Sequence, residues 1–317
     1  MTSAPVPRDA PTGAGAPGSR SRRPPPARPT RTLDLNDNPS SAPPSLGGWE
    51  AAFRARYRDQ SGARPGPGWN DVLETILDHR SVRRFRADPL PAGALDTIVA
   101  AAQSASSSSN LQAWSVVAVE DPERRARLAA LAGGQRHVAE APLVLVFLAD
   151  LARLDGAARG RGVPAEGLDY LESFLVGVVD AALAAQNAVV ALESLGLGCC
   201  YIGAVRNRPE EIAAELGLPP KAFAVFGLAI GIPDPAAGTG VKPRLPPAVV
   251  LHRERYQAAE PHELSGYDGR LRSFQREQRM REQDWTVQAT ERVKGPESLS
   301  GRHRLRDALA ALGFHLR

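Results

Sequence analysis

The stretch from residue 168 to 195 constrains the fold more than any other part of the chain. Drawn as a helix, it is apolar on most of its circumference. A helix that is apolar nearly all round is buried, because no polar side is left to face water. Two glycines, Gly196 and Gly198, follow at once and end the helix. We therefore expect the other segments to pack around one long buried helix.

Shorter segments on both sides of this stretch alternate between helical and strand patterns. Helices are predicted from residue 71, with Asn70 or Asp71 as the cap, and over residues 95–102, 122–131 and 209–216. Strands are predicted over residues 114–119, 143–148 and 223–230, and around Tyr201. Beyond Pro247 the chain is polar and arginine-rich, with helical patterning up to Phe314. This alternation of helices and strands indicates an α/β or α+β fold.

The first 69 residues differ in composition from the rest. Eleven of the 28 prolines fall between Pro5 and Pro44, with almost no branched apolar or aromatic residues. Such a segment buries too little apolar surface to offset the entropy lost on ordering. We predict a disordered Pro/Arg-rich tail over residues 1–69, with a few helical residues around 49–57 before the breaker at 65–68. The alternative is a binding arm for nucleic acid or membrane that uses its arginines.

Several classes of site are absent from the sequence. The chain has no P-loop, dinucleotide fingerprint, nucleophile elbow or HExxH motif, and its six histidines are scattered, so we predict no metal site. The net charge of +4 is small for 317 residues and does not argue for nucleic acid. The adjacent Cys199 and Cys200 are expected to be buried thiols rather than a vicinal disulfide. With no signal peptide or membrane span recognised, we expect a cytoplasmic protein.

Three polar segments are not explained by core packing. Residues 79–83 (HRSVR) close the first predicted helix and suit a phosphate, although a basic helix end that complements the helix dipole is the alternative. Residues 106–112 hold four serines, which in most proteins form an ordinary loop. Residues 242–246 (KPRLP) hold two cations in a rigid extended frame, so both side chains could face one anion.

Together and in this order, these segments resemble the nitroreductase superfamily, in the NADPH-preferring branch of oxygen-insensitive nitroreductases and flavin reductases. The resemblance runs from about Val72 to the C-terminus, and the first 70 residues have no counterpart in it. The matching residues are 79–83, the serine run ending in Leu111-Gln112, Gly133-Gly134-Gln135, Gln186-Asn187, residues 193–198, Tyr201-Ile202-Gly203 and residues 242–246.

The resemblance implies an α+β fold with a central, mostly antiparallel sheet flanked by helices. It also implies a homodimer, built in a domain-swapped-like manner, with FMN at the subunit interface and the helix over residues 168–195 as the core of that interface. Residues 70–317 would form the FMN-binding domain. The excursion over residues 250–317 would add contacts to NADPH and to the partner subunit.

The family pattern also implies roles for residues in the two basic segments. Arg83 would lie beside the N1–C2=O edge of the flavin and stabilise its reduced form, and Arg80 would complete the cofactor-binding segment. The FMN phosphate would be held by His79, Ser81, Lys242 and Arg244.

Further contacts are implied for the flavin and for NADPH. Ser107 and Gln135 would hydrogen-bond the ribityl chain or the ring, and Tyr201, Ile202 and Gly203 would lie along the ring. The NADPH contacts would be Arg276, located by counting back from a tryptophan, and Arg302 near the C-terminus.

The implied function is an FMN-dependent oxidoreductase. It would take hydride from NADPH and pass it to nitroaromatics, quinones or similar acceptors in a ping-pong cycle, with no side chain acting as an acid or base. Two alternatives remain: an NADPH-dependent FMN reductase that supplies reduced flavin to a partner enzyme, and a flavin-binding relative without turnover.

Overall fold

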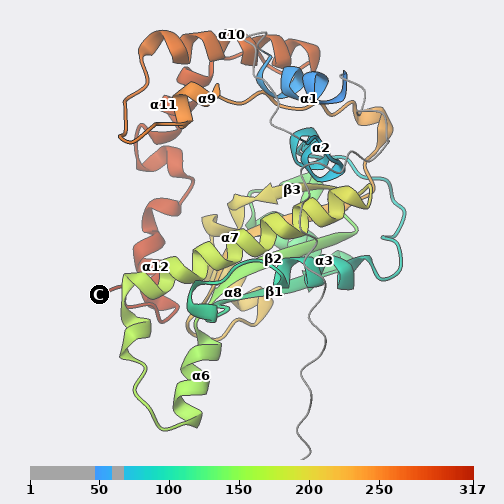
Figure 1. The fold of residues 1–317 in the computed structure, drawn as a ribbon. Coiled ribbons are helices and arrows are strands. Elements are labelled where there is room, and N and C mark those ends of the chain that lie inside the picture. The colour runs from blue at the N-terminus through green and yellow to red at the C-terminus, as the bar shows by residue number, and fades with distance from the viewer. Residues whose placement is uncertain (1–46, 59–67) are drawn as a thin grey trace, which may run out of the picture. The chain divides into compact units, whose positions relative to one another are not determined.

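The computed structural model of the chain describes residues 47–58 and 68–317 (Figure 1). All of the described residues lie within one compact unit, residues 44–317. Most of the predicted tail lies outside the described residues. Residues 47–57, which the sequence assigned to that tail, form helix α1 (Gly47–Tyr57), as the pattern around residues 49–57 predicted.

The core of the fold is a four-stranded sheet. Its strands are β1 (Trp114–Val119), β2 (Leu143–Asp150), β3 (Gly198–Ile202) and β4 (Ala222–Gly231). They lie in the order β1-β2-β4-β3, and all three neighbouring pairs are antiparallel. The predicted class, α+β with a mostly antiparallel sheet, is confirmed. The strands at residues 114–119, 143–148 and 223–230 were placed correctly, the last two to within two residues.

The central strand β2 explains how the two faces of the sheet are covered. Its odd-numbered residues from Leu143 to Ala149 pack in one buried cluster, whereas Val144, Val146 and Leu148 pack in a second cluster on the other face. The first cluster includes residues of α3 (Ala94–Gln103) and α7 (Leu171–Ser194), which Figure 1 shows against the sheet. The second includes residues of α4 (Pro122–Leu131) and α8 (Pro209–Leu216). A strand buried on both faces reads as an unbroken apolar run rather than an alternating one.

The remaining helices follow the predicted order, and the structure adds some helices that the sequence patterns did not predict. Helix α2 begins after Asn70, whose side chain accepts a hydrogen bond from the Leu73 amide, as predicted for the cap. The other helices are α2 (Asp71–Asp78), α5 (Arg136–Glu140), α6 (Ala152–Gly160), α9 (Pro247–Val250), α10 (Pro261–Glu277), α11 (Trp285–Val293) and α12 (Leu305–Ala311).

Helix α7 is less buried than its sequence predicted. One side packs into the first cluster through small residues such as Ala181, Ala184 and Ala188. The opposite side exposes Leu171, Leu175, Val179 and Leu183, which recur every four residues. The expectation of a helix buried all round is therefore wrong for the single chain, because the sheet and α3 cover only one side.

By length and composition α7 could also cross a membrane, with a mean hydropathy of 1.8 over its most apolar window. The expectation that the chain has no membrane span therefore stays a prediction. Core helices of globular proteins meet the same criteria, and α7 packs against the sheet.

Candidate functional site

The segment that follows α2 is extended rather than helical. Helix α2 ends at Asp78, and the Val82 amide donates a hydrogen bond to the carbonyl of Cys199 in β3 at 2.8 Å. Ser81 forms a parallel bridge with Cys199, so this segment lies along the edge of the sheet. His79 caps α2, as expected of a segment that closes this helix, but the alternative of a basic helix end is wrong for the residues that follow it. In an extended segment successive side chains point to opposite sides, which separates the basic residues into two groups.

Arg83 lies on the side of this segment where a group of cations gathers. The positive charges of Arg83 and Arg244, together with partial burial as the larger cause, lower the pKa of Lys242. Arg83 also lies beside the thiol of Cys200 and the ring of His137, whose pKa values both respond to its charge. Among the described residues, Arg83, Lys242 and Arg244 take part in no ion pair. Like charges that converge without a carboxylate form a site suited to an anion.

His79 is held at this site by a carboxylate of α7. Its Nδ1 lies 2.7 Å from Oε1 of Glu193. A carboxylate can only accept a hydrogen bond, so Nδ1 of His79 is the donor, and the Nε2 atom is left for another partner. Glu193 lies among the residues that match the family pattern, but without a predicted role, because nothing local shows that the end of a helix 114 residues away meets His79.

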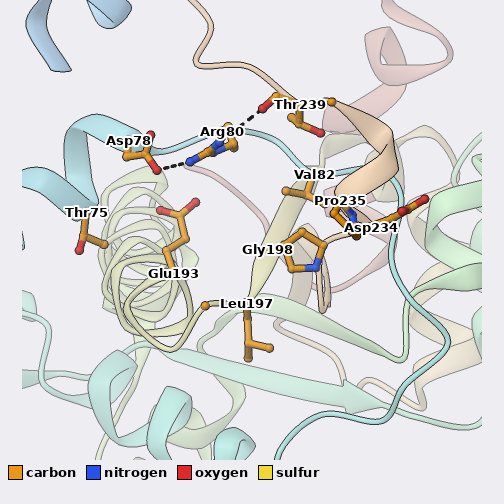
Figure 2. Close-up of a pocket in the computed structure, with 13 residues that line it drawn as sticks. Thr75, Asp78, Arg80, Val82, Glu193, Leu197, Gly198, Asp234, Pro235 and Thr239 are labelled. Atoms are coloured by element: carbon orange, nitrogen blue, oxygen red, sulfur yellow. Dashed lines mark hydrogen bonds and ion pairs between the residues drawn. The ribbon is translucent and has the colours of Figure 1, made fainter. Parts of the chain in front are cut away.

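Arg80 lies on the other side of the extended segment. Its guanidinium bonds to the carboxylate of Asp78 and reaches the carbonyl oxygen of Thr239 (Figure 2). With Val82 it lines a cavity of about 500 Å³, which neither Arg83 nor Lys242 lines. Gly198 also lines this cavity, and a Cβ there would lie 2.6 Å from Cγ2 of Val82, so the close approach of the segment to β3 requires glycine. The structure therefore separates the Arg80 side chain from the other predicted phosphate ligands.

The predicted ring contacts lie on β3 and just after it. Tyr201 is exposed and packs edge-on against Phe226, with 5.2 Å between ring centroids. Ile202 is buried in the second cluster, so its side chain packs inside the fold. Gly203 begins a 3-10 helix, η3 (Gly203–Asn207). The adjacent Cys199 and Cys200 are free buried thiols, as predicted, and burial raises the pKa of both.

Ser107 is engaged within the fold. Its hydroxyl donates to Oδ2 of Asp180 at 2.7 Å and accepts a hydrogen bond from the Gln112 amide at 2.7 Å. Asp180, in the middle of α7, also accepts hydrogen bonds from the amides of Ser108 and Ala113. The serine run is thus a loop held by one buried carboxylate, and one acceptor position of the Ser107 hydroxyl stays free for a ligand.

Gln135 caps α5, and its side-chain amide donates to the carbonyl of Ala132 at 2.8 Å. Two residues further on, His137 lies close enough to Arg83 for the arginine charge to lower its pKa, after burial as the larger cause. The segment that holds Gln135 therefore lies near the cations. The Nε2 atom of His137 is buried and has no hydrogen-bond partner in the described part of the chain, and the sequence did not single it out.

The two predicted NADPH arginines lie in different surroundings. Arg276, at the end of α10, forms an exposed two-point ion pair with Glu282 at 2.8 and 3.0 Å. Arg302 donates to Oδ1 of Asn207, the last residue of η3, at 2.8 Å. Burial and the charges of Arg206 and Arg292 lower the pKa of Arg302. Arg206, Arg292 and Arg302 thus form a second cationic group. Arg276 pairs with Glu282 instead and takes no part in it.

Comparison with known proteins is consistent with this arrangement. The model of the nitroreductase family matches residues 76–232, and that of the nitroreductase family C-terminal domain matches residues 242–317. The chain belongs to the nitroreductase family. An "FMN reductase (NADPH)" of Bacillus subtilis is 42% identical over 225 residues, which cover 69% of this chain and 90% of that relative. An "oxygen-insensitive NADPH nitroreductase" of Salmonella typhimurium is 40% identical over 64% of this chain and 82% of that relative.

Among solved structures, the NfrA1 nitroreductase of B. subtilis superposes with a TM-score of 0.72 at 39% identity. It covers 77% of this chain and 99% of its own. The predicted family and its fold are therefore confirmed for this nitroreductase. The family matches begin at residue 76, so they leave out helix α1 and most of α2.

Proposed function

We propose that this nitroreductase is an NADPH-dependent flavin oxidoreductase that binds FMN through residues 79–83 and 242–246. The observation that carries the proposal is the convergence of Arg83, Lys242 and Arg244 without a carboxylate partner among the described residues. The two segments are separated by more than 150 residues of sequence, so the fold itself assembles this charge. An FMN phosphate supplies the matching dianion.

The donor set fits the predicted phosphate ligands. Lys242 and Arg244 would supply charge, and the Ser81 hydroxyl would supply a further donor. His79, with Nδ1 bonded to Glu193, would donate from Nε2 as the imidazolium. Arg80 would contribute through its main chain alone, because its side chain is turned toward Asp78. Residues 70–317 would then form the FMN-binding domain.

Bound FMN would supply the hydride-accepting and hydride-donating centre. Arg83 would offset negative charge at the N1–C2=O edge without a proton transfer, because a guanidinium keeps its charge at any physiological pH. Tyr201 and the main chain of Ile202 and Gly203 would border the ring, and Ser107 and Gln135 would contact the ribityl chain or the ring. No acid or base is needed from the chain.

Arg302 would bind a phosphate of NADPH. Burial, and next the charges of Arg206 and Arg292, lower the pKa of Arg302. The two arginines also increase the positive charge around it, beside the 3-10 helix that begins at Gly203. Arg276 would join by leaving Glu282, since exposed ion pairs are weak and exchange readily.

The working unit would be a cytoplasmic homodimer formed through α7, with NADPH and a small acceptor as partners and with no nucleic acid or membrane. The exposed row of Leu171, Leu175, Val179 and Leu183 supports the dimer, because monomeric proteins rarely expose such a continuous apolar surface. The acceptor would be a nitroaromatic, a quinone or free FMN, and steady-state rates with each would distinguish a nitroreductase from an FMN reductase.

The test is the absorbance of the purified full-length protein. We expect bound FMN that NADPH bleaches without oxygen, and loss of this pigment in Lys242→Ala/Arg244→Ala. The matched control, Arg84→Ala/Arg86→Ala, removes the same charge from exposed arginines paired with Asp234 and Asp88, and should keep the pigment. Equal pigment in both double variants, or a wild-type protein that binds no added FMN, would contradict the proposal.

A further inference from the structure

Helix α1 lies outside the part of the chain that matches the nitroreductase family, yet it reaches the proposed phosphate site. The match begins at residue 76, whereas α1 spans Gly47–Tyr57. Its end is fixed to α10: Arg58 forms a two-point ion pair with Glu277 at 2.5 and 2.6 Å, and its guanidinium lies 5.3 Å from the ring centroid of Phe274. Figure 1 shows α1 beside α10.

The side chain that α1 contributes is Arg56, which is 6% exposed. Its Nη2 donates to the carbonyls of Leu77 at 2.7 Å and His79 at 2.9 Å. Its Nη1 donates to the carbonyl of Lys242 at 2.9 Å. One guanidinium therefore joins the main chains of the two segments that would bind the phosphate.

The main chain of α1 and a side chain of α10 add to this connection. The Arg244 amide donates to the carbonyl of Arg56 at 2.9 Å, and the Tyr267 hydroxyl donates to the carbonyl of Pro243 at 2.8 Å. Every residue from 242 to 244 thus has a main-chain group held by α1 or α10. These contacts fix the backbone positions from which the side chains of Lys242 and Arg244 extend.

The charge of Arg56 has no carboxylate in hydrogen-bond contact within the described residues, since its hydrogen bonds go to three carbonyls. Burial, and next the charge of Arg244, lower its pKa. A buried cation is costly unless hydrogen bonds and a nearby opposite charge compensate it. The three carbonyls supply the first. The carboxylates of Asp78 and Glu193 supply part of the second, and an anion beside Arg244 would add to it.

We infer that Arg56 is a positioning residue for the FMN phosphate, which sets the spacing between residues 79–81 and residues 242–244 from a helix outside the family match. The inference rests on the proposed function, because it assumes that these segments bind the phosphate. Arginine suits the role, because its planar fork can serve acceptors on both sides at once, whereas a lysine ammonium cannot hold the same fixed spacing.

The test compares the affinity of the apoprotein for FMN and for riboflavin, which lacks the phosphate. We expect Arg56→Met to raise the Kd for FMN by about tenfold or more, as for the loss of charge-assisted hydrogen bonds, and to leave the Kd for riboflavin nearly unchanged. Arg56→Lys keeps the charge and should still weaken FMN selectively. The control Arg54→Met removes an exposed arginine from the same helix and should change neither Kd.

A purely structural role predicts a different result. It would lower the melting temperature of the apoprotein and weaken FMN and riboflavin equally, or leave both unchanged, and either outcome overturns the inference. If Arg56→Met does not fold, Arg56→Lys tests the inference by the same ratio, that of the Kd for FMN to the Kd for riboflavin.

The variant Lys242→Ala/Arg244→Ala separates this inference from the proposed function. If this double variant also leaves the ratio of the two Kd values unchanged, the proposed phosphate site is wrong. If only the double variant changes it, the site stands and Arg56 alone is excluded.

Discussion

At the scale of single residues, Arg83 carries the proposed chemistry. Replacing it by glutamine keeps a polar side chain and removes the charge beside the N1–C2=O edge. We expect the rate of flavin reduction by NADPH to fall about tenfold or more, because loss of one preorganised electrostatic contact at a reacting centre costs up to about 100–1,000-fold. Anaerobic stopped-flow absorbance measures this rate, and the midpoint potential of the bound flavin should become more negative.

The neighbouring Arg84 provides the control for this experiment. Arg84 is exposed, and its guanidinium pairs with Asp234 at 2.8 Å, on the side of the segment away from Arg83. Arg84→Gln should reduce at the wild-type rate. An Arg83→Gln variant with an unchanged rate and potential would show that this guanidinium does not act on the flavin.

Arg302 tests the proposed contact with NADPH. We expect Arg302→Ala to raise the KM for NADPH about tenfold and to change the KM for NADH much less, since a guanidinium recognises the 2′-phosphate that only NADPH carries. Steady-state kinetics with both nucleotides measures the effect. Arg304→Ala, which removes an exposed arginine paired with Glu210, is the control. Equal changes in both KM values would mean that Arg302 does not discriminate the phosphate.

At the scale of elements, the loop before β1 depends on α7. Asp180 is 1% exposed and accepts hydrogen bonds from the Ser107 hydroxyl and from two amides. Asp180→Ala would leave the buried Ala113 amide unpaired and release the Ser107 hydroxyl and the Ser108 amide, so we expect the free energy of unfolding to fall by roughly 2–4 kcal/mol. Urea denaturation followed by circular dichroism measures it. Glu120→Ala, in the exposed turn after β1, should cost little, and a comparable loss there would contradict this explanation.

The sequence predicted elements well wherever one periodicity held over the whole segment. Strand β1 and helices α4 and α8 have the predicted bounds, because each carries an unambiguous pattern or cap. The conformation of residues 79–83 stayed open, because a basic pentapeptide after a helix looks the same whether the helix continues or stops. Its pairing with Cys199, which decides the conformation, is a contact between residues far apart in sequence.

The same limit explains which site residues the sequence found. Lys242 and Arg244 stood out because prolines flank them in an otherwise unexplained segment. Arg56 and His137 carry no local signal, and the segment of Glu193 matched without a role, since each of the three acts on a segment at least 20 residues away. Arg56 in addition lies in a helix outside the family match, so resemblance could not indicate it.

At the scale of the whole molecule, two helices leave apolar surface exposed. On α2, Val72, Leu73 and Ile76 are exposed, and α2 contacts α7, whose outer row is exposed as well. Hydrophobic periodicity cannot distinguish burial within a chain from burial against a second copy, which is why the sequence predicted α7 to be buried all round. Obligate dimer interfaces are as apolar as domain interiors, so a second copy of the chain would complete that prediction.

The dimer can be tested by placing a charge in this surface. Val179, near the middle of α7, is 52% exposed in the single chain and would be covered in the dimer. We expect Val179→Asp to shift the mass measured by sedimentation from that of a dimer to the 33.8 kDa of one chain, because an unpaired carboxylate in an apolar interface is strongly unfavourable. Bound FMN should be lost in parallel, since the resemblance places FMN between subunits.

The control is Val293→Asp, which changes an equally apolar and more exposed residue at the end of α11. This variant should keep the sedimentation mass and the bound FMN of the wild type. A wild-type protein that sediments as a single chain while holding FMN would show that the row on α7 is not an interface and that one chain alone completes the site.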